Sequence, residues 1–217
     1  MKKENWKSFC VGFGLLVLFI IWTLALKVVD VKAIGPQGSS VGFATLNKWV
    51  VGVTGVNMSL YVITDWLGLV PICFIFGFGI LGLCQWIKRK NILKVDYNIL
   101  ALGVFYIVVM AVYIFFEMYV VNYRPVLING YLEASYPSST TMLVMCVMPT
   151  AMMQLNLRIK TKALKRCENI LIAVFIAFML LGRLVSGVHW ISDIIGGALF
   201  SSGLVIIYYS VCKQFQA

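Results

Sequence analysis

Long apolar segments alternate with short polar ones along the whole chain. Six of them are evident, at about residues 9–26, 61–86, 97–121, 138–155, 170–185 and 194–211. Each has close to the length of about 20 residues that an α-helix needs to cross about 30 Å of hydrocarbon. The residue-by-residue alternation of a membrane barrel is missing. The pattern therefore predicts six transmembrane helices.

A shorter helix is predicted between the first two spans, after the turn-forming segment 35–40. Its apolar residues recur at helical spacing, at Phe43, Leu46, Trp49, Val50 and Val53. Asn47 and Lys48 fall on the other side, which is typical of an amphipathic helix lying in the membrane interface. A packed lid with no contact to lipid is the alternative.

The composition supports the same class. Hydrophobic residues make up 61% of the 217 residues, charged residues 12%, and the mean hydropathy is +0.94. We expect an all-α, polytopic membrane protein with residues 1–217 in a single domain. Its six cysteines have neither metal-ligand spacing nor a disulfide framework, and we expect no metal and no cofactor.

The net charge of +10 reflects short basic clusters between the apolar segments, so nucleic-acid binding is not expected. Thirteen Lys and Arg residues lie in the N-terminal head, two alternate turns and the tail, and five lie in the opposite segments. Positive charge remains in the cytoplasm. The distribution predicts a multi-pass cell-membrane protein with both termini in the cytoplasm.

The segment 182–193 contains the only histidine of the chain, His189. Asp193 follows four residues later, so on a helix the two share a face. The carboxylate can then accept a hydrogen bond from one imidazole nitrogen and leave the other free to attack. Arg183 can bind a phosphate in front of that nitrogen. The alternative is an Arg-His-Asp cluster that caps two helices.

With this topology, three polar segments meet at the outer face. They bring together Arg124, the helix N-terminus at Ser138, Arg183 and His189, a set that suits a phosphate. Asp65 lies near the start of the second span. An acid there either has a catalytic role or caps the N-terminus of the helix.

These residues resemble the type 2 phosphatidic acid phosphatases of the vanadium haloperoxidase superfamily, with the motifs K-x6-R-P, P-S-G-H and S-R-x5-H-x3-D. Arg183, His189 and Asp193 match the third motif, Arg124-Pro125 ends the first and Pro137-Ser138 begins the second. The resemblance implies that His189 forms a phosphohistidine and that Asp193 orients it. It further implies that Arg124, Arg183 and Ser138 hold the phosphoryl oxygens.

Four positions depart from these motifs: Gly182 replaces a serine, Glu117 the lysine, and Ser139 and Thr140 the glycine and histidine. In the family that histidine is the general acid, a role worth about 10²–10⁴ in rate. Glu117 and Glu133 are candidates to replace it. Glu117 can instead form an ion pair with Arg124, and Glu133 can be a solvated loop charge.

The loss of a proton donor matters least when the leaving group is itself a phosphate, with a pKa of about 6. The expected function is therefore an outward-facing lipid phosphatase, with a lipid (polyprenyl) diphosphate as the favoured substrate. The alternatives are a phosphatidic acid or phosphatidylglycerophosphate monoesterase and a non-catalytic relative that binds or translocates phosphorylated lipid. The expected partners are the lipid substrate and the bilayer; the oligomeric state is open.

Overall fold

The computed structural model describes residues 3–215, and in this range the chain is helical, with isolated bridges but no strands. Six spans in this range are long and apolar enough to cross a membrane, which confirms the predicted class. The helices are α1 (Lys3–Ala25), α2 (Ala44–Thr54), α3 (Met58–Leu67), α4 (Leu69–Arg89), α5 (Tyr97–Met118), α6 (Ser139–Arg158), α7 (Lys162–Val185) and α8 (Ile191–Phe215), with short 3₁₀ turns at Pro36–Gly38 and Ile92–Lys94.

The helices extend beyond the apolar segments at their charged ends. The predicted fifth span began near residue 170, whereas α7 begins at Lys162. The predicted second span ended near residue 86, whereas α4 continues to Arg89. Lys and Arg are good helix formers, so a helix continues through residues that hydropathy excludes. The second span is also built from two helices, because α3 and α4 meet at Gly68.

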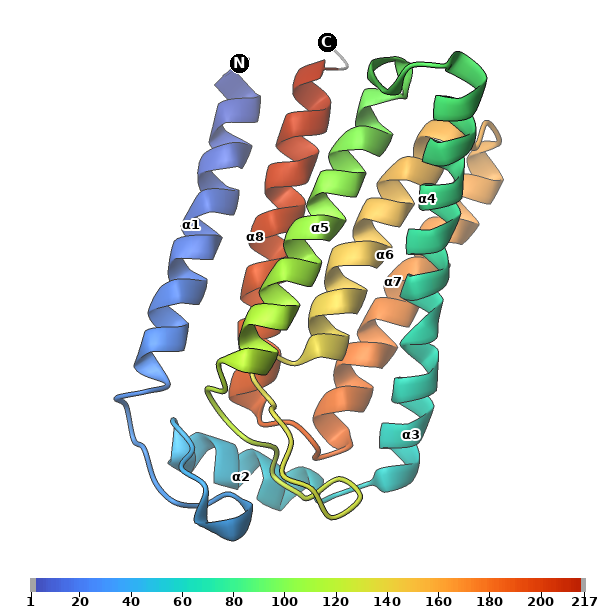
Figure 1. Ribbon diagram of the computed structural model, residues 1–217. Helices are drawn as coiled ribbons and strands as arrows, with labels where there is room; N and C mark the ends of the chain where they lie inside the picture. The colour runs from blue at the N-terminus through green and yellow to red at the C-terminus, as the bar shows by residue number, and fades with distance from the viewer. Residues whose placement is uncertain (1–2, 216–217) are drawn as a thin grey trace.

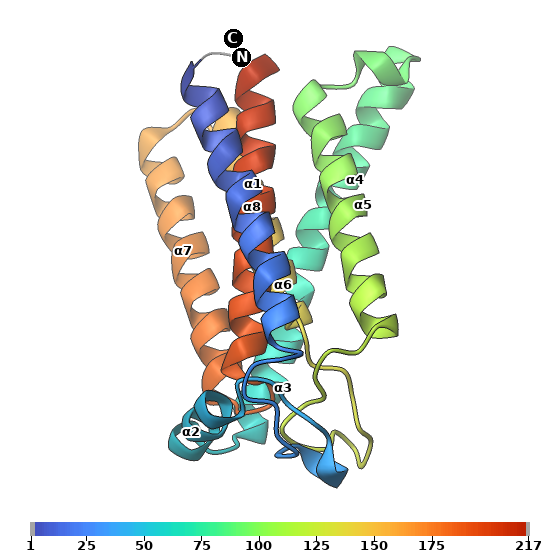
Figure 2. The same ribbon diagram turned by 90° about the vertical axis from the view of Figure 1, so that its left-hand side faces the viewer.

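The two ends of the bundle differ in character. Figure 1 shows both termini at one end, and α2 and the loop between α5 and α6 at the other. Both views show α1 running beside α8 (Figures 1 and 2). A Cβ on Gly12 would lie 2.8 Å from the carbonyl oxygen of Gly203, so these two glycines allow the close contact of the helices.

The helix α2 is present as predicted, but the burial of the polar residue Asn47 was not expected. Leu46, Trp49 and Val53 are exposed, whereas Val50 is buried and Asn47 is completely buried. The Asn47 amide donates to the Gly42 carbonyl and to Ser192 Oγ, and it accepts from the Ser192 N–H. These bonds compensate for the loss of water around a buried amide.

An aromatic cluster holds the segment before α6 against α1 and α5. Phe19 contacts the rings of Phe116, Tyr136 and Phe200. The Tyr136 hydroxyl lies 2.6 Å from Thr23 Oγ1. Because Tyr136 is anchored in this way, the residue before it is held in a fixed position beside the turn between α7 and α8.

Candidate active site

His189 lies in the turn between α7 and α8 rather than on a helix, so the expected shared helical face with Asp193 was wrong. The turn is packed tightly against the end of α2. Gly187 has a φ of +66°, and a Cβ there would collide with the Gly55 carbonyl. The Asn57 N–H donates to the Ser186 carbonyl, 2.9 Å away. Only glycine fits both constraints, and the turn is thereby fixed.

The link between His189 and Asp193 runs through a third residue, Ser135. The Ser135 hydroxyl donates to Asp193 Oδ2 at 2.6 Å and lies 3.0 Å from His189 Nδ1. The expected direct bond is therefore replaced by a serine bridge. With its own proton on the carboxylate, Ser135 accepts from Nδ1–H, which assigns the imidazole tautomer. The Nε2 atom then carries the free lone pair.

Asp193 is fully buried and its oxygens accept several further bonds. Asn122 Nδ2 donates at 3.1 Å, the Trp190 N–H at 3.0 Å and Ser192 Oγ at 3.4 Å. The bond from Trp190 satisfies a free donor at the start of α8, as in a capping box. Asp193 thus caps α8 and supports His189, so the two interpretations of this residue are compatible.

The free nitrogen of His189 faces two arginines. Arg183 Nη2 lies 3.2 Å from His189 Nε2, and Arg124 Nη1 lies 3.4 Å away. The ring of Tyr61 packs against both guanidinium groups, at 5.0 and 5.8 Å. The Nε atoms of both arginines are buried without a hydrogen-bond partner among the described residues. Unmet buried donors beside a nucleophile suit an anionic ligand.

Each arginine also has a carboxylate partner. Arg124 Nε lies 3.1 Å from Glu133 Oε2, without hydrogen-bond alignment, and Arg183 Nη1 lies 3.6 Å from Asp65 Oδ1. The ion pair that Glu117 was considered to form with Arg124 is therefore formed by Glu133. The side chains of Glu133 and Asp65 are 41% and 59% exposed. Because these carboxylates are partly exposed and neither contact is a hydrogen bond, an incoming phosphate can compete for the arginines.

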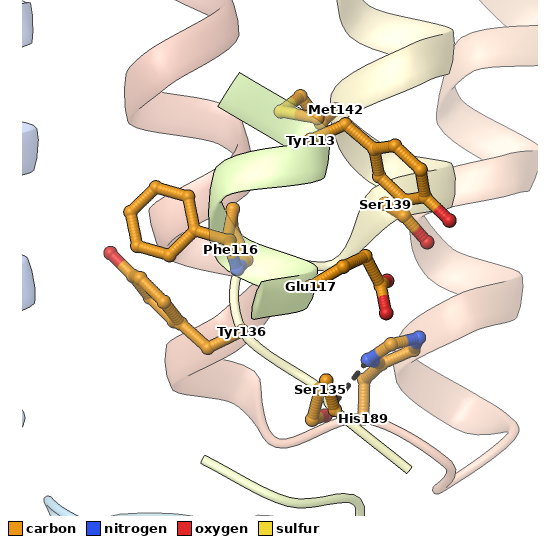
Figure 3. Close-up of a pocket in the computed structure, with 10 residues that line it drawn as sticks. Tyr113, Phe116, Glu117, Ser135, Tyr136, Ser139, Met142 and His189 are labelled. Atoms are coloured by element: carbon orange, nitrogen blue, oxygen red, sulfur yellow. Dashed lines mark hydrogen bonds between the residues drawn. The ribbon is translucent and has the colours of Figure 1, made fainter. Parts of the chain in front are cut away.

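A small pocket opens beside His189. Glu117, Ser139 and Tyr113 line it together with His189, and Figure 3 shows the Glu117 carboxylate directed toward the imidazole. Thr140 lines an adjoining groove instead. Ser139 lines both spaces, whereas Thr140 lines only the groove.

Ser138 does not line this pocket, and its contacts are those of a helix cap. Its hydroxyl is fully buried and accepts from the Thr141 N–H at 3.4 Å. Its own N–H donates to the Asp193 carbonyl at 3.1 Å. The helix α6 begins where the Pro-Ser sequence predicted, and its N-terminus is attached to α8 beside the site.

Burial lowers the pKa of His189 well below 6.5, and the positive charges of Arg124 and Arg183 lower it further. Because the folded-state pKa is depressed, the imidazole is neutral across about pH 6–8, the range in which an ordinary histidine titrates. We expect the ¹³Cε1 NMR signal of His189 to stay constant over this range. As the only histidine, it gives a single signal, and a titration midpoint near 6.5 would contradict the burial of its ring.

Comparison with known proteins identifies the family of the chain. Residues 72–216 match the family model described as the PAP2 superfamily. The chain belongs to this superfamily. The family model covers more than half of the chain, including α5 to α8 and the three residues whose side chains lie within hydrogen-bond distance of His189, namely Arg124, Ser135 and Arg183.

The fold of this PAP2 protein resembles the crystal structure of the first transmembrane PAP2 type phosphatidylglycerolphosphate phosphatase from Bacillus subtilis. The TM-score is 0.62 at 16% identity, and the match covers 94% of this chain and 96% of that one. A search of curated sequences gave no significant match. The structural likeness confirms the membrane fold.

One departure of this PAP2 protein from the family motif has a packing explanation. Gly182 stands where the third motif begins with serine, and a Cβ there would lie 2.7 Å from Thr64 Cγ2. The close approach of α3 in turn places Thr64 Oγ1 3.3 Å from Arg183 Nη1.

Within residues 3–215, no three His, Cys, Asp or Glu side chains form a group suited to a metal ion.

Proposed function

We propose that this protein is a membrane lipid phosphatase that transfers a phosphoryl group to His189 and then to water. The observation that carries this proposal is the position of His189 between two systems. Its Nδ1 is bonded through Ser135 to Asp193, and its Nε2 faces Arg183 and Arg124. This is the arrangement of an activated nucleophile beside an anion site.

In the first half-reaction, the Nε2 lone pair of His189 attacks the phosphorus. The bond to the bridging oxygen breaks, and the lipid part leaves with that oxygen. Arg124 and Arg183 bind the equatorial oxygens, and the start of α6 at Ser138 contributes its helix dipole. Asp193, acting through Ser135, stabilises the imidazole as it becomes positive.

The lipid part of the substrate has a suitable binding groove. Apolar side chains from α4, α5 and α6 line it, among them Leu69, Ile72 and Phe76. It shares Tyr113, Ser139 and Met142 with the pocket at His189. An acyl or prenyl chain in this groove would hold its phosphate near His189. This supports a membrane lipid over a soluble phosphate ester.

For the substrate, we favour a lipid (polyprenyl) diphosphate. Thr140 occupies the position of the family's proton-donating histidine and cannot protonate a leaving alkoxide. A departing phosphate needs little protonation. A phosphatidylglycerophosphate or phosphatidic acid monoester is the second candidate, since the similar structure is a phosphatidylglycerolphosphate phosphatase.

Purified protein assayed in parallel on polyprenyl diphosphate, phosphatidylglycerophosphate and phosphatidic acid should act fastest on the diphosphate. Thr140→His should raise monoester activity more than diphosphate activity, because an alkoxide leaving group benefits most from a proton donor. The double variant Thr140→His with Ser139→Gly also restores the glycine of the family motif, and with it the backbone freedom at the start of α6. Equal turnover of all three lipids by the wild type would contradict the diphosphate preference.

A binding protein or lipid translocator could also use the two arginines. Such a protein gains nothing from the Asp193–Ser135–His189 chain, which prepares a lone pair for attack. The enzyme is therefore the stronger proposal. Binding of the lipid without any phosphate release, by a protein shown to be folded, would favour the non-catalytic alternative.

We propose that the site faces the outside of the cell membrane, with both termini in the cytoplasm and α2 in the outer interface. The basic turns around Lys88 and Thr161 support this orientation. In a background without cysteines, a cysteine introduced at Asn129 should react with an impermeant thiol reagent in intact cells. One at Thr161 should react only after permeabilisation, and the reverse result would invert the orientation.

A further inference from the structure

We propose that Glu117 is the general base that activates water in the second half-reaction, when phosphate is released from His189. This rests on the proposed phosphohistidine mechanism and extends it. A phosphate leaving group removes the need for a general acid in the first half-reaction, but it changes nothing in the second. Water must still lose a proton as it attacks the phosphohistidine, and the chain has no second histidine to accept it.

The position of Glu117 fits this role. It ends α5, lines the small pocket with His189, and directs its carboxylate toward the imidazole (Figure 3). This pocket has room for about one water molecule. The Ser139 and Tyr113 side chains also line it and bring hydroxyl groups that can orient a water. Glu117 is exposed and lies in the last turn of α5, next to the polar loop that follows, which gives the proton that it accepts a route to water.

The other carboxylates near the site are already engaged. Glu133 is paired with Arg124, and Asp65 is paired with Arg183. Asp193 is fully buried and accepts from Ser135 and Asn122.

Glu117, in contrast, forms no ion pair in the described part of the chain; its carboxylate is hydrogen-bonded to the Tyr113 hydroxyl, which lines the same pocket. A carboxylate at the edge of a phosphate site weakens anion binding by repulsion. As a proton acceptor, however, it has a direct use there. Glu117 stands where the family motif has a lysine, and Thr140 stands where it has a histidine. Relative to the motifs, the chain thus lacks one proton-transfer group and gains another.

In the proposed step, the water oxygen forms a bond to phosphorus as the bond from phosphorus to His189 Nε2 breaks. The electron pair of that bond returns to Nε2, which restores the neutral imidazole. One proton of the water passes to the Glu117 carboxylate and then to solvent. Arg124 and Arg183 hold the phosphoryl oxygens throughout, and inorganic phosphate leaves.

The test is the phosphoenzyme content of the Glu117→Gln variant, measured with ³²P-labelled lipid diphosphate. Glutamine keeps the size of the side chain but cannot accept the proton. We expect one equivalent of lipid product per protein molecule to appear in a rapid burst. The steady turnover that follows should be about 10²–10⁴-fold slower than that of the wild type. Acid-labile, base-stable ³²P should accumulate on the protein, and not when His189→Ala is added.

A matched control removes a carboxylate elsewhere. Glu168→Gln changes α7 at the end of the bundle away from the site and should leave both turnover and phosphoenzyme content at wild-type values. For Glu117→Ala, added formate should restore part of the steady rate. Full turnover by Glu117→Gln, or slow turnover without phosphoenzyme, would overturn the role of Glu117. An inactive wild type would instead overturn the proposed phosphatase.

Discussion

Replacement of His189 by alanine should reduce phosphate release to background, a loss on the order of 10⁴–10⁶-fold. In the proposed mechanism this side chain provides the atom that bonds to phosphorus, and no other imidazole exists in the chain. The arginines and the lipid groove remain, so lipid binding should persist. Phosphate release from the lipid diphosphate and lipid retention by the inactive protein measure the two effects separately.

A second variant separates catalysis from folding. Alanine leaves the Ser135 hydroxyl without its contact to Nδ1, which can cost about 1–3 kcal/mol. His189→Asn retains an N–H near the position of Nδ1 but has no atom at Nε2. It should unfold at the wild-type temperature and yet be as inactive as the alanine variant. Turnover by either folded variant would exclude His189 as the nucleophile.

The transmembrane plan follows from the sequence because span length is a local property. About 20 apolar residues in a row indicate a helix whatever the rest of the chain does. The break at Gly68 is different. It divides a continuous apolar segment without changing its hydropathy, so only the structure reveals it.

The arginines and the proposed nucleophile were also predicted from the sequence. Topology brings Arg124, Arg183 and His189 to one membrane face, and the structure places both guanidinium groups beside Nε2. The missing element was Ser135, thirteen residues after Asn122 in a polar loop with no distinguishing motif. Its role depends on how the loop packs against a turn more than 50 residues away, which no local pattern encodes.

Asn47 illustrates the same limit on helix faces. Its amide lies at a polar position of an amphipathic helix, and periodicity directs such a side chain to solvent. It is buried because Ser192, 145 residues later, offers both a donor and an acceptor. Periodicity cannot identify a buried polar residue whose partners come from another part of the chain.

The bridge through Ser135 changes what is expected of Asp193. Asp193→Asn replaces an acceptor by a group that can donate to Ser135 Oγ. The serine proton then turns toward His189 Nδ1, and the imidazole proton moves to Nε2. The lone pair needed for attack is lost, so we expect a decrease in kcat of up to about 10⁴-fold with little change in lipid binding. An undiminished rate would leave Asp193 with only its capping role.

Ser135→Ala should have a smaller effect, because it removes the bridge but does not impose the wrong tautomer. Leaving Nδ1–H without a buried partner costs about 1–3 kcal/mol, which corresponds to about 5–150-fold in rate. Ser201→Ala is the matched control: this serine is also buried in the bundle, but it donates to the Met142 carbonyl and should leave the rate unchanged.

The double variant Ser135→Ala with Asp193→Asn tests the bridge itself. If Asp193 acts on His189 through the Ser135 hydroxyl, asparagine can impose the wrong tautomer only when that hydroxyl is present. The double variant should then be no slower than Asp193→Asn alone, and faster if the tautomer is the main cause. Rate losses that multiply would mean that Ser135 and Asp193 act independently, and that the bridge does not carry the effect of the carboxylate to the imidazole.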